Sequence, residues 1–233
     1  KLIEKTIELR EITKWQVPIF VKIAGARPYY DTALAVKAGA DVVVLDGMQG
    51  GTAATQEVFI ENVGQPTLAC IRPAVDALQD LNSHREVQLI ISGGIRNGAD
   101  VAKALALGAD AVSIGSAAMI AIGDNDPKWE KEYEKLGSKA GAYDDWHEGN
   151  DPAGISTQKP ELMKRLDPKK AGRKLSNYLK VMSLEAQTIA RACGKNSLHN
   201  LEPEDLCALT VEAAAMARVP LAGTSWIPGI KKK

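Results

Sequence analysis

This chain has few cysteines and no net charge, and each of these features excludes some classes of protein. The 233 residues include 3 cysteines, and Cys70, Cys193 and Cys207 lie too far apart for a CxxC motif or a zinc-ligand spacing. Such isolated cysteines indicate reduced thiols in a cytoplasmic protein. The 29 basic residues balance the 29 acidic ones, so no bulk field favours nucleic acid or an anionic membrane.

Long apolar runs are missing too. No stretch approaches the roughly 18 consecutive apolar residues of a membrane-spanning helix, and no signal peptide is visible. We therefore expect a cytoplasmic protein without nucleic-acid or membrane partners. Because the chain begins at Lys1 with a helical pattern rather than with Met, we also expect it to be the C-terminal part of a longer protein, or one processed chain of it.

Four mostly apolar runs predict buried parallel strands, at residues 17–23, 41–46, 87–92 and 110–115. Helical patterns precede or separate them, at residues 3–15, 31–39, 71–81 and 101–106. This order is typical of βα units with right-handed crossovers. Four such strands make half of a (β/α)8 TIM barrel, and the missing half would have to close the sheet edges from elsewhere.

Glycine turns end the last two predicted strands, with Ser92, Gly93 and Gly94 after the first and Gly115 and Ser116 after the second. The carboxyl ends of barrel strands carry the functional loops, and phosphate often binds after the seventh and eighth strands. Glycine admits a phosphate oxygen close to a backbone N–H, and a following helix adds a positive dipole end. One such turn is usually only a turn, whereas two after successive strands favour phosphate binding.

Two other strand ends carry candidate side chains. Lys22 interrupts an apolar strand near its carboxyl end, so its ammonium group either enters a site or reaches solvent. Asp46 ends the next strand, either as a capping residue or as an acid behind the site. The glycine loop that follows it is either a flexible turn or a wall of backbone amides over a planar or anionic ligand, and contains Gly50, Gly51 and Thr52.

The chain divides into three predicted parts. Residues 1–123 form the half barrel, residues 124–160 form a long polar loop excursion, and residues 161–233 form a helical extension with a tail. Within the extension, helical patterns cover residues 161–193 and 202–218.

Three segments of the half barrel resemble the FMN-binding synthase domain of glutamate synthases: VKIAG (21–25), AGADVVVLDGMQGGTAA (38–54) and ISGGIRNGADVAKALALGADAVSIGSAAMIAIG (91–123). Two later segments, STQKPELMKRLDP (156–168) and residues 190–229, are similar to one branch of that family. The branch comprises the large subunit of N-methylglutamate synthase, or methylamine–glutamate N-methyltransferase, and related glutamate synthase-like subunits.

The resemblance implies a (β/α)8 barrel that carries FMN. It places Lys22 beside the flavin and the substrate carboxylate as the catalytic residue. Near the isoalloxazine ring or the substrate it places Gly50, Gly51 and Thr52. It assigns the phosphate clamps to the two turns that the strand pattern also indicates: Ser92, Gly93, Gly94, Gly115 and Ser116.

The resemblance also implies an activity and partners. In the family's chemistry ammonia or methylamine condenses with a 2-oxo acid such as 2-oxoglutarate to give an imine. Reduced flavin then delivers hydride to the imine carbon, which yields glutamate or N-methylglutamate. In the methylamine version the imine can arise from glutamate by prior oxidation, with no net redox change. Glutaminase-like and GXGXG-type subunits are the implied protein partners.

One departure from the family pattern is informative. Glutamate synthases hold a 3Fe–4S cluster with three cysteines, the first just after the MIAIG-like segment. Here Gly123 is followed by Asp124, and Asp151 opens the DPAGI run that stands where a Cys-Pro-Val-Gly run would be. No cysteine lies between Cys70 and Cys193, and thiolates are needed to hold such a cluster. We therefore predict no iron–sulfur cluster, which puts electron delivery through a cluster in doubt.

Two other classes of protein stay open. Another FMN- or phosphate-binding barrel enzyme, such as an inosine-monophosphate-dehydrogenase-like protein, would combine similar SGGIR and IGS turns with a nucleophilic cysteine in an exposed loop. Cys70 is the only candidate for that role, and its surroundings predict a helix. The second alternative is a half barrel that has lost the flavin and serves as a scaffold, against which the intact glycine loops argue.

Overall fold

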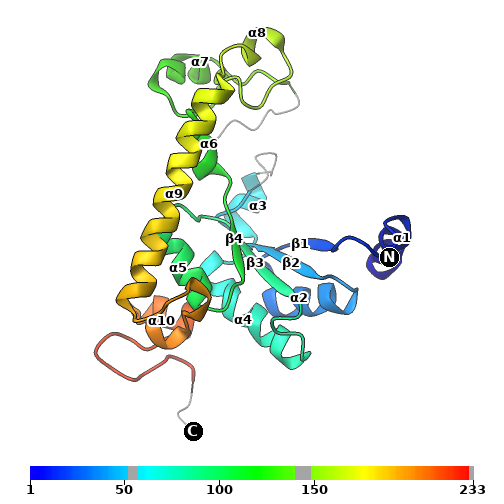
Figure 1. Ribbon diagram of the computed structural model, residues 1–233, viewed down its shortest axis with the longest axis vertical. Helices are drawn as coiled ribbons and strands as arrows, with labels where there is room; N and C mark the ends of the chain where they lie inside the picture. Colours follow the sequence, from blue (N-terminus) through cyan, green and yellow to red (C-terminus); the bar gives the residue numbers. More distant parts are fainter. Residues whose placement is uncertain (52–56, 140–147, 231–233) are drawn as a thin grey trace.

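The computed structural model describes residues 1–51, 57–139 and 148–230 (Figure 1). Four parallel strands form one sheet in the order β1-β2-β3-β4. They are β1 (Phe20–Ala24), β2 (Val42–Asp46), β3 (Gln88–Ser92) and β4 (Ala111–Ser113). All four predicted strands are therefore confirmed, and the chain has an α/β fold with a parallel sheet.

Three helices connect consecutive strands and share their hydrophobic core: α2 (Pro28–Lys37), α4 (Thr67–Asp80) and α5 (Gly98–Ala106). The remaining α-helices are α1 (Leu2–Ile12), α3 (Glu57–Asn62), α6 (Ser116–Ile122), α7 (Glu130–Lys135), α8 (Pro160–Met163), α9 (Pro168–Ala192) and α10 (Val211–Ala217). Short 3-10 helices are η1 (Pro127–Trp129), η2 (Leu198–Asn200) and η3 (Pro203–Asp205). In the parts of the chain that the structure describes, no helix is both long and apolar enough to cross a membrane.

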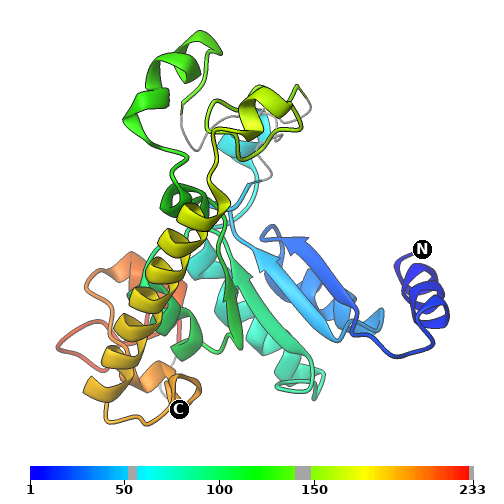
Figure 2. The ribbon, with the colours of Figure 1, turned by 45° about the horizontal axis from the view of Figure 1, so that its top comes forward.

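The two faces of the sheet differ in burial, because α2, α4 and α5 cover only one of them (Figures 1 and 2). On the covered face the side chains of Val43, Leu45 and Leu89 are completely buried. On the opposite face of β1, Phe20 is 56% exposed and Lys22 is exposed as well. Since alternate residues of a strand point to opposite faces, this pattern identifies one core face and one uncovered face. Within the described residues, β1 and β4 are edge strands.

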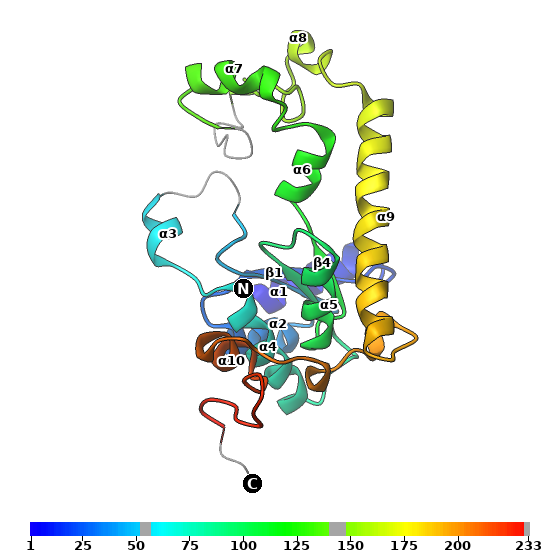
Figure 3. The same ribbon diagram turned by 90° about the vertical axis from the view of Figure 1, so that its left-hand side faces the viewer.

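Helix α9 packs against α5 and α6 on the β4 side of the molecule (Figure 3). The side of α9 that faces these helices carries the buried residues Ala171, Met182, Ala186 and Ala190, spaced for one face of a helix. Small side chains on this face allow α5 and α9 to approach closely. The helix α9 thereby supports the segment that connects β3 to α5.

The prediction of one continuous helix at residues 202–218 is wrong. Residues 202–218 do not form one helix, because η3 and α10 are separated by an extended segment in which Ala208 forms a parallel bridge with Leu221. The hydroxyl of Thr210 then accepts a hydrogen bond from a backbone N–H of α10 and caps that helix. Backbone pairing and the cap override the continuous helical pattern of the sequence. The helical stretch predicted at residues 161–193 divides into α8 and α9.

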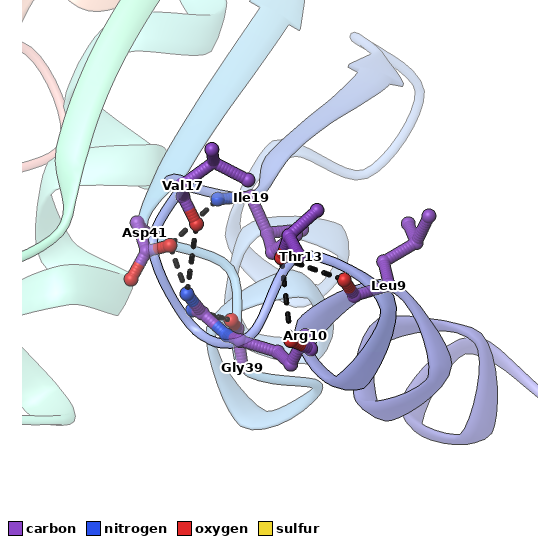
Figure 4. A network of polar contacts seen from close by, with 7 residues as sticks. All are labelled: Leu9, Arg10, Thr13, Val17, Ile19, Gly39 and Asp41. Carbon is purple, nitrogen blue, oxygen red and sulfur yellow. Dashed lines mark hydrogen bonds and ion pairs between the residues drawn. The ribbon is translucent and has the colours of Figure 1, made fainter.

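Arg10 of α1 links the segment before β1 to the segment before β2 (Figure 4). Its Nη2 lies 2.7 Å from Asp41 Oδ2 and donates a hydrogen bond of 3.0 Å to the carbonyl of Gly39. The same Asp41 oxygen accepts a hydrogen bond of 2.6 Å from the N–H of Ile19. The Arg10 guanidinium, and then the Ile19 amide, hold the pKa of Asp41 below its usual value. The ionised carboxylate of Asp41 therefore holds together the segments that precede β1 and β2.

We expect the stabilising contribution of Asp41 to disappear in acid. A carboxyl group whose pKa is lower in the folded state stabilises the fold above its unfolded pKa of about 4, and this contribution is lost as the pH falls through the folded pKa. Asp41→Asn should therefore lower the thermal midpoint at neutral pH, and this effect should shrink progressively as the pH falls below about 4. Glu11→Gln, on the exposed surface of α1, is the control and should leave the midpoint unchanged throughout this range. A neutral-pH midpoint of Asp41→Asn equal to that of the wild type would contradict the prediction.

Candidate active site

The strand register gathers the candidate residues at one end of the sheet. Ala24, Asp46, Ser92 and Ser113 are aligned partners and form one row across the carboxyl ends of the four strands. Lys22 lies two residues earlier on β1, so it shares the uncovered face with this row. Three of the four residues in the row have small side chains, which leaves space above the carboxyl ends on that face.

Lys22 and Asp46 form an ion pair at this end of the sheet. The distance between Lys22 Nζ and Asp46 Oδ2 is 2.9 Å, and the Lys22 side chain is 57% exposed while that of Asp46 is 13% exposed. The buried Asp46 Oδ1 has no hydrogen-bond partner among the described residues. Since a pair with one exposed partner adds little stability, its main effect is to hold the ammonium group at the rim of the uncovered face. Of the two roles that the sequence leaves open for Asp46, this geometry favours the acid behind the site.

The glycine loop after β2 packs against the glycine turn after β3. The N–H of Gly50 donates a hydrogen bond of 2.8 Å to the carbonyl of Gly47. A Cβ on Gly50 would lie 2.5 Å from the carboxyl carbon of Asp46, and a Cβ on Gly93 would lie 2.9 Å from the Gly50 nitrogen. A side chain at Gly93 would therefore prevent the close approach of the two loops, and one at Gly50 would displace the Asp46 carboxylate. Gly51 is exposed, whereas Thr52 lies outside the described residues.

Gln49 and Thr67 brace these loops, and the sequence gives no signal for either residue. Gln49 Oε1 accepts a hydrogen bond of 2.8 Å from the Thr67 N–H and lies 2.8 Å from the Thr67 hydroxyl. The same hydroxyl lies 2.9 Å from the carbonyl oxygen of Gly93. The start of α4 therefore connects the loop after β2 to the turn after β3.

The turns after β3 and β4 contain backbone N–H groups that can donate hydrogen bonds to a ligand. Gly93 and Gly94 have φ values of +103° and +73°, in the left-handed region that favours glycine. Gly115 has φ −125° and nothing within 4 Å of the position of a Cβ, and Ser116 begins α6. Among the described residues, no hydrogen bond engages the N–H groups of Gly93, Gly94 or Gly115. Both turns can therefore donate hydrogen bonds to an anion.

Cys70 does not meet the requirements of a nucleophile. It lies in α4, as the sequence predicts, and its side chain is 1% exposed. Burial raises the pKa of its thiol to about 11, so the reactive thiolate is scarce at neutral pH. The geometry therefore argues against a barrel enzyme that uses this cysteine.

Comparisons with known families and proteins agree with the resemblance seen in the sequence. The family model described as a conserved region in glutamate synthase matches residues 1–127 and 142–196. A glutamate synthase large subunit-like protein of Rhizobium meliloti (strain 1021) is 83% identical over 225 residues, which cover 97% of this chain and 51% of that protein. An archaeal glutamate synthase (NADPH) of Methanocaldococcus jannaschii is 40% identical over 194 residues, which cover 83% of this chain and 35% of that protein. The chain thus spans about half or less of the length of these relatives.

Solved structures share the fold. A mutant flavocytochrome b2 with pyruvate bound matches with a TM-score of 0.51 and 18% identity, over 84% of this chain and 37% of that one. A mutant flavocytochrome b2 with benzoylformate matches with a TM-score of 0.52 and 19% identity, over 84% of this chain and 36% of that one. At this level of identity the likeness concerns the arrangement of strands and helices alone.

Proposed function

Because the chain belongs to the glutamate synthase family, we propose that the carboxyl ends of its strands bind FMN and form part of an enzyme that makes glutamate or N-methylglutamate. The observation that carries this proposal is the Lys22–Asp46 pair, which holds a cation on the uncovered face beside two glycine turns. Its substrates would be an amine, either ammonia or methylamine, and a 2-oxo acid. Glutaminase-like and GXGXG-type subunits would be its partners.

The residues present fit FMN. Small side chains line the rim of the uncovered face, and the open space beside Gly115 could accept a phosphate group. The N–H groups of Gly93, Gly94 and Gly115 would hold that phosphate, with Ser116 at the start of α6. Gly50, Gly51 and Thr52 would lie near the ring or the substrate. When bound, FMN supplies the hydride transfer that amino acid side chains do not perform.

Lys22 would act through its charge. An ammonium group fixed beside Asp46 can stabilise negative charge that develops on the bound reactants, or can hold the carboxylate of the 2-oxo acid. Charge that is already in place where new charge develops usually makes the largest single contribution to catalysis. Asp46 would position Lys22 by accepting a hydrogen bond from its ammonium group. The ammonium group would then not have to move during the reaction.

We further propose that the sheet is half of a (β/α)8 barrel, with residues 1–123 as the half barrel, 124–160 as an excursion and 161–233 as the helical extension. Both open edges and the uncovered face support this proposal, since a closed barrel would pair the edges and enclose the face. The exposed Phe20 on that face, and Leu179 and Leu184 on the free side of α9, would become buried. The other four strands would come from elsewhere in the complete protein.

The experiment that tests this function uses the complete protein with its native subunits. The purified complex should be yellow, with flavin absorbance at about 450 nm, and denaturation should release FMN. Assays with methylamine plus glutamate, and with glutamine plus 2-oxoglutarate, would then distinguish the two amine donors. A colourless complex that gains no activity on addition of FMN would contradict the proposal and favour the scaffold alternative.

Gly115→Val should weaken FMN binding, and any backbone strain that it adds can be measured separately as a change in the stability of the apoprotein. A Cβ at Gly115 meets no protein atom within 4 Å, although the backbone there (φ −125°, ψ −87°) lies outside the helical and extended regions. A side chain would instead occupy the space proposed for phosphate, so we expect the Kd for FMN to rise about tenfold or more. Flavin titration followed by fluorescence gives the Kd, and thermal unfolding of the apoprotein gives the stability. Unchanged affinity would place the phosphate away from this turn.

A further inference from the structure

Three polar side chains from separate segments meet in the interior of the region between α6 and α9. Asp124 follows α6, Tyr133 lies in α7, and Asp151 lies in the turn before α8. They are 5%, 1% and 2% exposed, respectively. Carboxylates are rarely buried to this degree unless they are paired, so the cluster requires an explanation. It lies in the part of the molecule beyond α6, away from the sheet (Figure 3).

Hydrogen bonds join the three residues into one network. The Tyr133 hydroxyl lies 2.8 Å from Asp151 Oδ1 and 3.1 Å from Asp124 Oδ1. The Asp151 carboxylate also accepts hydrogen bonds from the backbone N–H groups of Ala153 at 3.0 Å, Ile155 at 2.8 Å and Ser156 at 2.6 Å. Burial and the bond to Asp151 raise the pKa of Tyr133, so its hydroxyl keeps its proton. The Asp151 carboxylate thus stabilises the turn at residues 151–156 and connects this turn to Tyr133 of α7.

A second set of contacts surrounds the network. Arg165 Nη1 lies 2.8 Å from Glu132 Oε2 and donates a hydrogen bond of 2.9 Å to the carbonyl of Pro152. Its guanidinium group also lies 4.9 Å from the centre of the Trp129 ring. Gly154 has φ +74°, and a Cβ there would overlap the carbonyl oxygen of Leu162. The turn at Asp151 is therefore held both by the Arg165 side chain and by the close packing of Gly154 against Leu162.

The same positions do not fit an iron–sulfur cluster. Asp124 and Asp151 stand where the family resemblance places cluster cysteines, and the network offers only carboxylate and phenol oxygens, whereas such clusters are held by thiolates. The three cysteines lie elsewhere, in α4, at the end of α9, and before α10. Within the described residues, no group of three or more His, Cys, Asp or Glu side chains could hold a metal ion.

We propose that the network of Asp124, Tyr133 and Asp151 holds the described segments between α6 and α9 together by hydrogen bonds, in the place where a cysteine-ligated cluster would lie. The protein accordingly carries no iron–sulfur cluster in this region. This inference concerns iron content and local order, so it holds or fails independently of the proposed flavin.

The first test measures iron and acid-labile sulfide in the complete protein, purified without oxygen after expression with ample iron. We expect far less than one iron atom per chain and no cluster signal in the electron paramagnetic resonance spectrum, whether or not FMN is bound. Stoichiometric iron and acid-labile sulfide in the purified protein would overturn the inference. This test requires no variant, so a folding defect cannot obscure it.

The second test measures hydrogen exchange in peptides that cover residues 151–157. Tyr133→Phe keeps the ring and removes only the hydroxyl, so the amides that Asp151 binds should exchange roughly tenfold faster, the effect of losing about one hydrogen bond to a charged group. Tyr30→Phe, at a tyrosine that is 66% exposed, is the matched control and should leave these peptides unchanged. Peptides from β2 report whether either variant perturbs the whole fold. Unchanged exchange at residues 151–157 in Tyr133→Phe would show that the network does not hold the turn.

Discussion

Replacing Lys22 with methionine is expected to lower kcat/KM of the amine-transfer reaction by about 10²–10³-fold, because a fixed charge at the reacting centre would be lost. The fold should survive, since the Lys22 side chain is 57% exposed and its ion pair with Asp46 adds little stability. Initial rates over a range of 2-oxo acid and amine concentrations would separate an effect on kcat from an effect on KM. If Lys22 holds the carboxylate of the 2-oxo acid, the rise in KM for that substrate should exceed the fall in kcat.

Three further variants sharpen this prediction. Lys37→Met removes an exposed lysine of α2, on the side of the sheet away from the proposed site, and should leave the rates unchanged. Lys22→Arg keeps the charge and should recover part of the activity. Asp46→Asn keeps the size of the side chain but loses its charge, so it should reduce activity less than Lys22→Met does. Full activity in Lys22→Met, with flavin still bound, would exclude a catalytic role for this lysine.

Much of the fold follows from local features of the sequence. The strands at 41–46 and 87–92 are mostly apolar runs followed by glycine, and near-continuous apolar runs are typical of buried parallel strands. Lys22 is conspicuous because it interrupts such a run. In each of these cases the signal lies within a few residues, which is why the pattern predicts the element without knowledge of the neighbours.

The contacts within the site depend on register, which a single sequence does not supply. Asp46 is the last residue of its strand, and only the pairing of Ala24 with Asp46 shows that Lys22 can reach it from the adjacent strand. Gln49 and Thr67 meet for a similar reason, because α4 begins where the loop after β2 returns to the sheet. Such partners are set by tertiary packing, which leaves no periodic signal in the sequence.

The polar stretch after α6 illustrates the same limit. Its composition predicts a loop, yet a buried tyrosine and two buried aspartates connect residues that are up to 27 positions apart, from Asp124 to Asp151. Buried polar networks of this kind consist of residue types that are common on surfaces, so composition alone does not distinguish them from solvated side chains. The error at residues 202–218 has the same origin, because the bridge between Ala208 and Leu221 involves backbone atoms only.

Gly98→Ala is expected to destabilise the protein by roughly 3 kcal/mol, because α5 and α9 approach each other at this residue with no space for a methyl group. A Cβ on Gly98 would lie 2.6 Å from the backbone nitrogen of Ala186 and would overlap the carbonyl oxygen of Met182. Backbone atoms inside a helix cannot move aside as the end of a flexible side chain can. The helices would have to separate, which would also weaken the hydrogen bond of 2.9 Å from the Gly98 N–H to Glu185 Oε2.

Gly172→Ala in α9 provides the matched control, since the same chemical change occurs at a helical glycine with nothing within 4 Å of the added carbon. Alanine costs less backbone entropy than glycine in a helix, so this variant should gain about 0.5–1 kcal/mol. Urea unfolding of the two variants and the wild type, followed by circular dichroism, measures both effects. Because the two substitutions make the same chemical change, a loss of stability at Gly98 together with a gain at Gly172 would identify the close contact between α5 and α9 as the cause. Stabilisation by both substitutions would mean that the two helices are farther apart in solution, and that α9 does not hold the segment after β3.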